Sequence, residues 1–361
     1  MSLMVFDGKK VCYAESHGLG DYVFYETMRI DLKFPLDVSG FVGSCNGLIC
    51  LSGNMEYDSI WYHEEPNEPL YIWNPITREI VALPPIANKN LVSLVHGFGY
   101  HPLTREYKVV RISYRSKSDD AFPYKGKVEV YTVGSGSGWR NVLKIDYLIE
   151  PSGENMNNCV NGALHWLKYE TGEILAFDLE AEEFHLVHTP PGLSPDSNKA
   201  LSSRVFVMRG CLCLAYEYEF YGDLWMLKKQ ENAVTSDFYN AKDQYYKSRK
   251  WIKEIEIPYE DLNHALKIFG LTKEGSVILK HDDGSMTQYH PKFTARVGDS
   301  ACIQLISHIN SFVSLKALGE VNVVTYKGEV KVATPIGSTK KSDGGRRKRN
   351  KKRKRKRTRE V

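Results

Sequence analysis

Short runs of alternating apolar and polar residues dominate this chain, and helical periodicity is scarce. Val110, Ile112 and Tyr114 alternate with polar residues, which is the two-residue period of a half-buried strand. Residues 127–133 form a second strand-like run that leads into the glycine-rich segment Gly134–Gly138. The pattern predicts an all-β protein.

A turn motif returns along the chain. An aromatic residue, a polar bridge and a second apolar or aromatic residue recur at Trp73–Ile80, Tyr100–Tyr107 and Phe177–Phe184. Polar residues favour the reversal of the chain, and strand-forming residues flank them on both sides, so each copy predicts a β-hairpin. Recurrence at intervals of tens of residues favours stacked repeat units over a single irregular core.

A second repeated element is a short apolar strand that follows a glycine, at residues 46–51, 161–166 and 209–214. Continuously apolar runs are typical of strands covered on both faces, and glycine permits the positive φ of the entering turn. Tryptophans recur in or near these units, and we expect them to pack between sheets because such rings bury a large area. They are Trp73, Trp166, Trp225 and Trp251.

Grouping the strands gives repeat units near 41–85, 92–142, 157–192, 203–258 and 264–295. Strand-like residues also remain at the two ends of the chain, in 1–36 and 302–318. We therefore predict a β-propeller-like array of about six four-stranded blades, in which the two ends complete the last blade and remove the exposed sheet edges. A pair of β-sandwiches is the competing architecture. Residues 230–250 are predicted to be a long loop between strands.

Charge divides the chain into two parts. Residues 340–361 hold 14 of the 48 Lys and Arg and 2 of the 44 Asp and Glu, a net charge of +12, which leaves −8 for residues 1–339. Hydrophobic content falls from Thr334 onward, so this segment cannot bury enough surface to fold. The predicted organisation is a folded domain over 1–333 and a disordered basic tail over 334–361.

The tail carries a dense cluster of basic residues, typical of a nuclear-import signal or a nucleic-acid patch. Its members are Arg346, Arg347, Lys348, Arg349, Lys351, Lys352, Arg353, Lys354, Arg355, Lys356 and Arg357. Without interleaved aromatic residues to stack bases, the tail is not expected to read a nucleic-acid sequence. An import receptor is the favoured partner, with nonspecific RNA binding and a merely solvated tail as alternatives.

Composition narrows the cellular compartment in which the protein is expected. No apolar run reaches 18 residues, so no membrane-spanning segment is expected, and the N-terminus lacks the pattern of a secretory signal. Seven cysteines without a C-x-x-C pair favour reduced thiols in the nucleus or cytosol. Cys211 and Cys213 would face one side of a strand and serve as small core residues.

Candidate chemistry is sparse, and we predict no catalytic residue, cofactor or metal site. Gly134–Gly138 lacks the Gly-Lys-Ser/Thr and helix of a phosphate-binding loop, so it is predicted to be a hairpin tip. His185 and His188 would point to opposite faces of a strand, and residues 281–283 read as a solvated turn. No nucleophile-elbow motif or paired carboxylate constellation is present, which ranks a carbohydrate-active enzyme last.

Several motifs follow one another in a specific order over about residues 40–318, although each motif alone is weak. The motifs are Gly43–Cys50, Trp73–Glu79 with Leu83–Pro85, Gly97–Pro102 with Tyr107–Val110, Val128–Tyr131 with Trp139–Arg140, Asn161–Trp166, Trp225–Met226 and Ser248–Trp251. Taken together, these motifs resemble one family, the plant F-box-associated interaction domain.

The resemblance implies the substrate-recognition module of a Skp–cullin–F-box (SCF) ubiquitin ligase receptor, related in logic to kelch-repeat receptors. It implies a protein substrate as partner, with a Skp-type adaptor and a cullin only if an F-box lies upstream, because residues 1–40 read as strands and not as the helical F-box. An adaptor-less competitor of intact F-box proteins and a nuclear RNA-associated scaffold are the alternatives. We expect the protein in the nucleus, and the cytoplasm is a second location that the sequence allows.

A loop is the expected place for partner binding, because propeller-type scaffolds bind through loops at one rim. Trp61 and Tyr62 are the candidates, since no strand pattern includes them.

Overall fold

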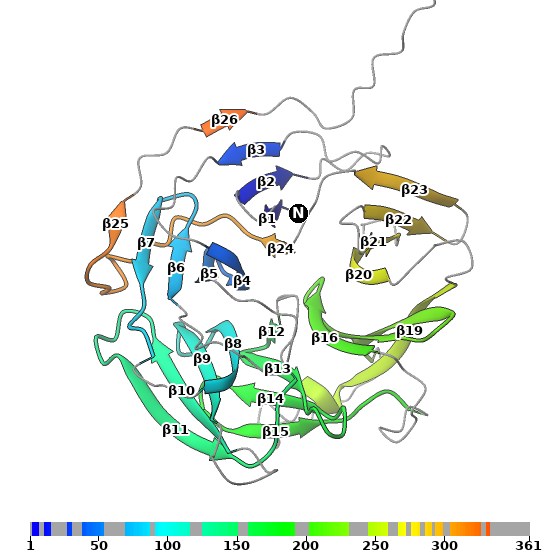
Figure 1. Ribbon diagram of the computed structural model, residues 1–361, viewed down its shortest axis with the longest axis horizontal. Coiled ribbons are helices and arrows are strands. Elements are labelled where there is room, and N and C mark those ends of the chain that lie inside the picture. The colour runs from blue at the N-terminus through cyan, green and yellow to red at the C-terminus, as the bar shows by residue number, and fades with distance from the viewer. Residues whose placement is uncertain are drawn as a thin grey trace, which may run out of the picture.

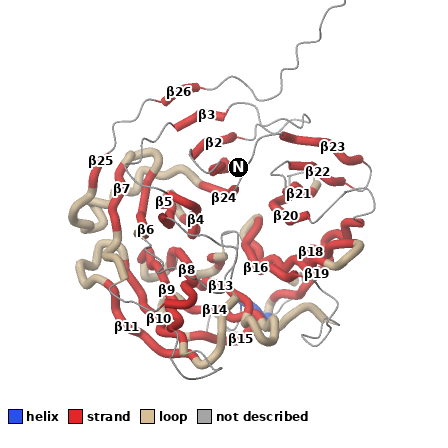
Figure 2. Tube along the Cα trace, in the orientation of Figure 1, coloured by secondary structure: helices blue, strands red, loops and turns tan. Residues whose placement is uncertain are grey.

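The structure is a computed structural model in which strands account for nearly all regular secondary structure (Figure 2). It describes residues 2–6, 11–15, 27–30, 38–53, 69–86, 91–115, 125–150, 158–191, 202–230, 245–258, 266–271, 276–281, 286–290, 293–298, 304–325 and 330–332.

The strands form six antiparallel sheets, which Figure 1 shows around a common centre. Sheet 1 contains β4 (Val38–Cys45), β5 (Leu48–Gly53), β6 (Leu70–Asn74), β7 (Glu79–Ala82) and β25 (Val324–Thr325). Sheet 2 contains β8 (Leu91–His101), β9 (Glu106–Arg115), β10 (Gly126–Thr132) and β11 (Trp139–Ile145). Sheet 3 contains β12 (Cys159–Val160), β13 (Ala163–Leu167), β14 (Ile174–Asp178) and β15 (Phe184–Val187).

The other three sheets complete the ring. Sheet 4 contains β16 (Ser202–Met208), β17 (Cys211–Glu217), β18 (Tyr221–Lys229) and β19 (Arg249–Pro258). Sheet 5 contains β20 (Leu266–Leu271), β21 (Val277–His281), β22 (Met286–His290) and β23 (Phe293–Gly298). Sheet 6 contains β24 (Gln304–His308), β1 (Ser2–Phe6), β2 (Val11–Glu15), β3 (Thr27–Ile30) and β26 (Val330–Val332).

The core lies between neighbouring sheets, where the continuously apolar strands of the sequence become buried on both faces. Residues of sheets 1 and 2 share one apolar cluster, sheets 2 and 3 the next, and so on through sheet 5. Trp73, Trp166 and Trp251 are buried in these layers, and Trp225 packs half-buried against one of them. The core role predicted for the tryptophans is confirmed.

Ring closure joins the two ends of the chain. β24 pairs antiparallel with β1, with Ser2 opposite His308. On the other side of β24, Ile306 packs in the apolar cluster of sheet 1 beside Phe41 and Trp73. This confirms that segments from both ends build the last blade, and the repeat units predicted from the sequence correspond to sheets 1 to 5.

The structure adds three features to the prediction. Sheets 1 and 6 each gain a fifth, outermost strand. The strand expected through residue 318 ends at His308, because the chain then leaves the sheet. Residues 309–325, which we call the strap, run in orange from β24 past β6 and β7 to β25 in Figure 1.

The third feature lies in the loop predicted at 230–250. Within its described part, residues 245–247 form a helical turn, and Tyr245 and Tyr246 are buried against sheets 3 and 4. The hydroxyl of Tyr246 lies 2.7 Å from Nε2 of His165. The end of this loop is therefore part of the core, which its polar composition did not indicate.

Candidate interaction face

One face of the ring carries the turns that join the first strand to the second, and the third to the fourth, in sheets 1 to 3, together with the β16–β17 turn of sheet 4. The chain reverses at every strand, so these turns share one edge, and the described β13–β14 and β17–β18 connections lie at the opposite edge. The Tyr107 hydroxyl donates to the carbonyl of Asn46 (2.9 Å), which joins the β8–β9 turn to the β4–β5 turn. We call this side the turn face.

The glycine-led strands begin with tight turns on this face. Asn46-Gly47, Asn161-Gly162 and Arg209-Gly210 all have positive φ at both residues, the conformation that two-residue hairpins require. The neighbourhood of Gly162 also requires glycine, because a Cβ there would lie 2.3 Å from Cδ2 of His101. The β12–β13 turn therefore sits directly on the β8–β9 turn of the neighbouring sheet.

The repeated turn motif owes its shape to a capping side chain at its first position. Asn74 Oδ1 accepts hydrogen bonds from the backbone N–H of Ile76 (2.8 Å) and Thr77 (3.3 Å). In the second copy, His101 Nδ1 accepts one from the N–H of Thr104 (3.2 Å). Such side chains substitute for a backbone acceptor in a turn, which explains why a polar residue follows the aromatic one.

The third copy uses Asp178, whose Oδ1 accepts from the N–H groups of the residues two and three positions later (2.8 and 2.7 Å). All three copies then place a residue in the left-handed region four positions after the cap, at Arg78, Arg105 and Glu182 (φ 61°, 57° and 57°). The three hairpins predicted from the sequence are confirmed, and their turns share one backbone path.

The first half of the strap is held by the cap of the first turn. Nδ2 of Asn74 donates to the carbonyls of Ser311 (3.1 Å) and Val313 (2.6 Å), on either side of Phe312. The Ser311 hydroxyl donates to the carbonyl of Asn46 (3.3 Å). One asparagine thus fixes both its own turn and the chain that crosses it.

Glu79 holds the middle of the strap. Its carboxylate accepts from the Ser314 hydroxyl (3.0 Å) and the N–H of Leu315 (2.6 Å). Leu315 is fully buried in the cluster between sheets 1 and 2, with Leu48 and Val109. A residue near the C-terminus therefore completes the core between two early blades.

The far half of the strap is tied to sheet 2. The Glu320 carboxylate accepts from the Tyr131 hydroxyl (3.1 Å to each oxygen) and from the N–H of Gly134 (2.7 Å). Burial, with the charge of Glu320 as a second cause, raises the pKa of Tyr131 to about 12. Gly134 (φ 79°) has no room for a Cβ, which would lie 1.9 Å from the carbonyl oxygen of Leu318. The predicted hairpin tip is confirmed and also receives the strap.

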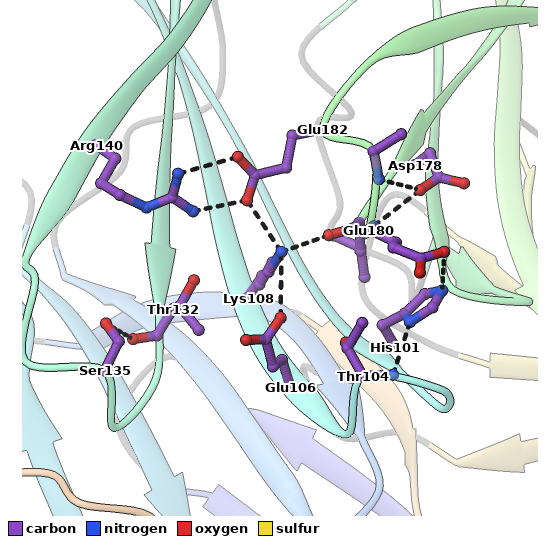
Figure 3. A network of polar contacts seen from close by, with 12 residues as sticks. His101, Thr104, Glu106, Lys108, Thr132, Ser135, Arg140, Asp178, Glu180 and Glu182 are labelled. Carbon is purple, nitrogen blue, oxygen red and sulfur yellow. Dashed lines mark hydrogen bonds and ion pairs between the residues drawn. The ribbon is translucent and has the colours of Figure 1, made fainter.

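A charged network joins sheets 2 and 3 (Figure 3). Nζ of Lys108, almost fully buried, donates to the carbonyl of Leu179 (2.6 Å) and to Glu182 (2.9 Å), and lies 3.3 Å from Glu106. Arg140 binds the same Glu182 through two nitrogens (2.7 and 3.1 Å). The network connects β9 and β11 of one sheet to the β14–β15 turn of the next.

Burial of Glu182 would raise its pKa, but hydrogen bonds from Arg140 and Lys108 outweigh that effect and hold the pKa below its ordinary value. The same hydrogen bond raises the pKa of Arg140. These charged groups are already paired across the junction of two sheets, so the geometry assigns them to holding the scaffold.

A second buried ion pair lies within sheet 2 on the side toward sheet 1. Arg111 donates to Glu129 through Nε (3.1 Å) and Nη2 (2.9 Å), and Lys127 reaches the other oxygen of Glu129 (2.6 Å). The Arg111 guanidinium lies 4.0 Å from the ring centroid of Trp139, whose indole N–H donates to the carbonyl of Pro84 (2.8 Å). Through Trp139, this ion pair also contributes to the contact between sheets 1 and 2.

A buried serine and histidine meet where the ring closes. Ser44 Oγ lies 2.9 Å from Nδ1 of His308, and both side chains are almost fully buried. Burial lowers the pKa of His308 to about 4, so the ring is neutral at neutral pH. A serine with 3% of its surface exposed offers no access to a substrate, so the pair closes the ring.

Thiol and metal chemistry find no support in the described part of the chain. Burial raises the pKa values of Cys45, Cys50 and Cys213, and that of Cys159 to about 11, which keeps these thiols protonated. Cys213 is buried and Cys211 packs beside it, as the strand pattern predicted. No group of three His, Cys, Asp or Glu among the described residues could hold a metal ion.

Exposed apolar side chains gather on the turn face. Phe312 of the strap is 87% exposed and Leu103 of the β8–β9 turn is 76% exposed, and Ile76 of the β6–β7 turn is also exposed. The sequence did not reveal Phe312, because the pattern around it reads as a continued strand. The carbonyls of Ser311 and Val313, on either side of Phe312, accept hydrogen bonds from Asn74, which identifies Phe312 as part of an ordered, outward-facing segment.

The binding residues predicted from sequence are outside the described residues. The basic cluster from Arg346 to Arg357 lies in the undescribed end of the chain, and Trp61 and Tyr62 lie in the undescribed part of the β5–β6 connection. The two ends of that connection are adjacent in space, because the N–H of Gly53 donates to the carbonyl of Pro69 (2.9 Å). Among the described residues, no helix is long and apolar enough to cross a membrane.

Comparison with known proteins gives a consistent result. F-box protein At3g07870 of Arabidopsis thaliana is 30% identical over 305 residues, covering 74% of this chain and 67% of that protein. F-box protein CPR1 of the same plant is 28% identical over 249 residues, covering 60% of this chain and 54% of that protein. The chain thus spans about half to two thirds of the length of these curated relatives.

Among solved structures, the nidogen/laminin complex has a chain that aligns with a TM-score of 0.38 at 11% identity, over 84% of this chain and 97% of that one. A likeness this weak carries no argument. Residues 9–289, in contrast, match the F-box associated beta propeller domain, and that match spans the strands from β2 to β21. This chain belongs to the F-box associated beta propeller domain family.

Proposed function

We propose that the chain is the substrate-recognition module of an SCF-type ubiquitin ligase receptor, acting in ubiquitin-dependent protein degradation. The observation that supports this most is the six-sheet propeller with the family match, since curated relatives are named F-box proteins. Its polar clusters hold blades together, and the exposed turns form a rigid face suited to binding a protein. No catalytic step is part of the proposal.

The test uses the tagged full chain expressed in plant cells, with and without an F-box fused ahead of residue 1. Both forms are recovered after inhibition of the proteasome, and bound proteins are identified by mass spectrometry. We expect both to capture the same substrate protein, and only the F-box form to bring the Skp-type adaptor and the cullin. If the F-box form recovers adaptor and cullin but neither form recovers a shared substrate, the proposed recognition role is wrong.

A second proposal concerns location and rests on the separation of charge. The segment 340–361 carries +12 and the remainder −8, so the net positive charge of the chain comes from the segment that holds the basic cluster. We propose that this cluster directs the protein to the nucleus through an import receptor. A fluorescent fusion of the full chain should be nuclear, and deletion of residues 340–361 should release it to the cytoplasm.

Nonspecific RNA binding by the same cluster is the competing outcome. It predicts that the full chain binds an RNA oligonucleotide with a steep salt dependence, and that deletion of 340–361 abolishes binding without moving the fluorescent protein. An unchanged nuclear location after deletion contradicts the import proposal.

A further inference from the structure

Three segments that are distant in sequence meet on the turn face and expose apolar side chains together. They are the β6–β7 turn (75–78), the β8–β9 turn (102–105) and the strap (309–325). Asn74 binds the first turn and both neighbours of Phe312. Asn46 receives hydrogen bonds from Ser311 of the strap and from Tyr107, which follows the second turn. We call the surface of these three segments the strap surface.

Two of the exposed apolar residues on this surface occupy corresponding positions of the turn motif. Ile76 and Leu103 are the third residues of two copies of one turn motif, and both side chains are exposed although the turns around them are tightly capped. Phe312 stands between the two carbonyls that Asn74 holds, and 87% of its surface is exposed. A rigidly held aromatic residue with aliphatic neighbours has the composition of a binding hot spot.

Charge on the strap surface has one sign. Its exposed ionisable residues are Arg78 and Arg105, at the fifth position of the two turns, and Lys316 of the strap. Glu320 is also a member, but it is buried and accepts hydrogen bonds from Tyr131 and Gly134. The surface therefore presents apolar side chains among positive charges, although residues 1–339 carry a net charge of −8.

We propose that the strap surface docks an extended acidic peptide segment of the captured protein, with an apolar side chain of that segment against Phe312. Charge complementarity selects this occupant, because carboxylates would pair with Arg105 and Lys316, and Arg78 adds positive charge beside them. The chain's own basic tail carries the same sign as the surface and is repelled by it. Aliphatic Ile76 and Leu103 do not stack on bases, which favours a peptide over RNA.

The proposal deepens the recognition role proposed above and rests on it. It also assigns a use to the first two copies of the turn motif, whose capping side chains hold the turns while the residues at the third and fifth positions are exposed. Two blades supply these outward positions, and the strap supplies the aromatic residue between them.

The test selects short random peptides displayed on phage against the full chain, then measures the binding of the selected, fluorescently labelled peptides. We expect enrichment of Asp and Glu beside Leu, Ile or Phe. Phe312→Asp and the double change Arg78→Glu with Arg105→Glu should each weaken binding by about tenfold or more, because they remove the anchor or reverse the charge.

Matched controls separate docking from folding. Arg209→Glu reverses an exposed cation that also has positive φ, in the β16–β17 turn of sheet 4, and Phe220→Ala removes an exposed aromatic side chain from the β17–β18 connection at the opposite edge. Both should bind the peptides as the unaltered protein does. Thermal unfolding of all four variants is measured, and Phe312→Ala provides a milder change if Phe312→Asp is unstable.

Several results would overturn the proposal. Selected peptides without acidic residues, or Phe312 variants that bind the peptides as the unaltered protein does, would contradict it. If Phe312→Asp abolishes a concentration-dependent dimer, the occupant is a second copy of the chain. If the variants lose binding to an RNA oligonucleotide but keep peptide binding, the occupant is RNA. If the Phe312 variants still capture the substrate in cells, the strap surface is not the docking site, while the recognition role stands. If peptides dock there but the chain captures no substrate in cells, the recognition role is wrong and the strap surface is still a peptide-binding site.

Discussion

Two neighbouring junctions of the propeller are held by different means. Between sheets 1 and 2, the strap inserts Leu315 into the core and is tied down by Asn74, Glu79 and Glu320; we call this the strap junction. Between sheets 2 and 3, Lys108, Glu182 and Arg140 form a charged network; we call this the ion junction. The strap junction depends on a segment 186 to 239 residues away in sequence from the residues that bind it, whereas the ion junction uses residues of the adjoining blades.

The comparison shows how a repeated motif acquires different roles. The first turn copy uses its cap, Asn74, to hold the strap, and the third copy uses Glu182 at its positive-φ position to hold a neighbouring sheet. One backbone path therefore supports two kinds of contact between blades. The following changes test whether the junctions are independent, from the largest expected effect to the smallest.

Glu182→Ala should be the most destabilising, by about 4 kcal/mol, because it leaves the buried Lys108 ammonium without its main counter-charge. Urea unfolding measures the change. Adding Lys108→Met to this variant should recover part of the loss, since the unpaired charge is then gone. If the double variant is no more stable than Glu182→Ala, the charge is not the cause.

Leu315→Ala should cost about 3 kcal/mol through the cavity it leaves between sheets 1 and 2. Leu318→Ala, at a half-buried position of the same strap, is the matched control and should cost less. Hydrogen exchange should rise in β7 and β9 while the β14–β15 turn stays protected. Equal loosening at both junctions would show that they are not independent.

Acid should begin to act on β8 and on the ion junction at different pH values. Burial, followed by the charge of Arg111, lowers the pKa of His96 on β8 to about 3, so the unfolded chain binds a proton there first and stability falls as pH decreases below about 6.5. The pKa of Glu182 is also depressed, so its contribution is present above about 4.5 and is lost below that pH.

Urea unfolding across this pH range measures both effects. His96→Asn should flatten the profile between about pH 6.5 and 3, and Glu182→Gln only the part below about 4.5. His165 and His308, each with a pKa lowered by burial to about 4, keep a residual slope in the first variant. An unchanged profile in His96→Asn contradicts the assignment of that slope.

Arg140→Ala should have the smallest effect, at most about 1 kcal/mol, because the arginine is 42% exposed and solvent screens its pair with Glu182. The loss should shrink further as salt is added, whereas the effect of Leu315→Ala should not depend on salt. A salt-independent loss in Arg140→Ala would indicate that packing of the side chain, not charge, is involved.

Much of this fold could be predicted from the sequence because its signals are local. The capped turns at Asn74, His101 and Asp178 and the glycine-led strands each lie within a few residues, and their spacing gives the blades. The strap could not be predicted in this way, since an extended segment that leaves a sheet has the same alternation as a strand. Likewise, Lys108 and Glu182 are 74 positions apart, and nothing near either residue identifies its partner.

The candidate site shows the same limit. Loops and tail were the expected binding regions because they lack strand patterns, and Trp61, Tyr62 and the basic cluster lie outside the described residues. Phe312 was missed because its exposure results from the path of the strap over Asn74, which only the folded chain reveals.

The pairing of β1 with β24 sets the order in which the ring can be completed. Ser2 and His308 are 306 positions apart, so a ribosome adding roughly 5–20 residues per second needs about 15–60 s between their synthesis. Strands β4 to β7 and sheets 2 to 5 are contiguous in sequence and can form as they emerge, while the edge of β1 lacks its partner throughout that interval. Nascent chains arrested before residue 304 should therefore depend most on chaperones, because the blade that is begun first is finished last.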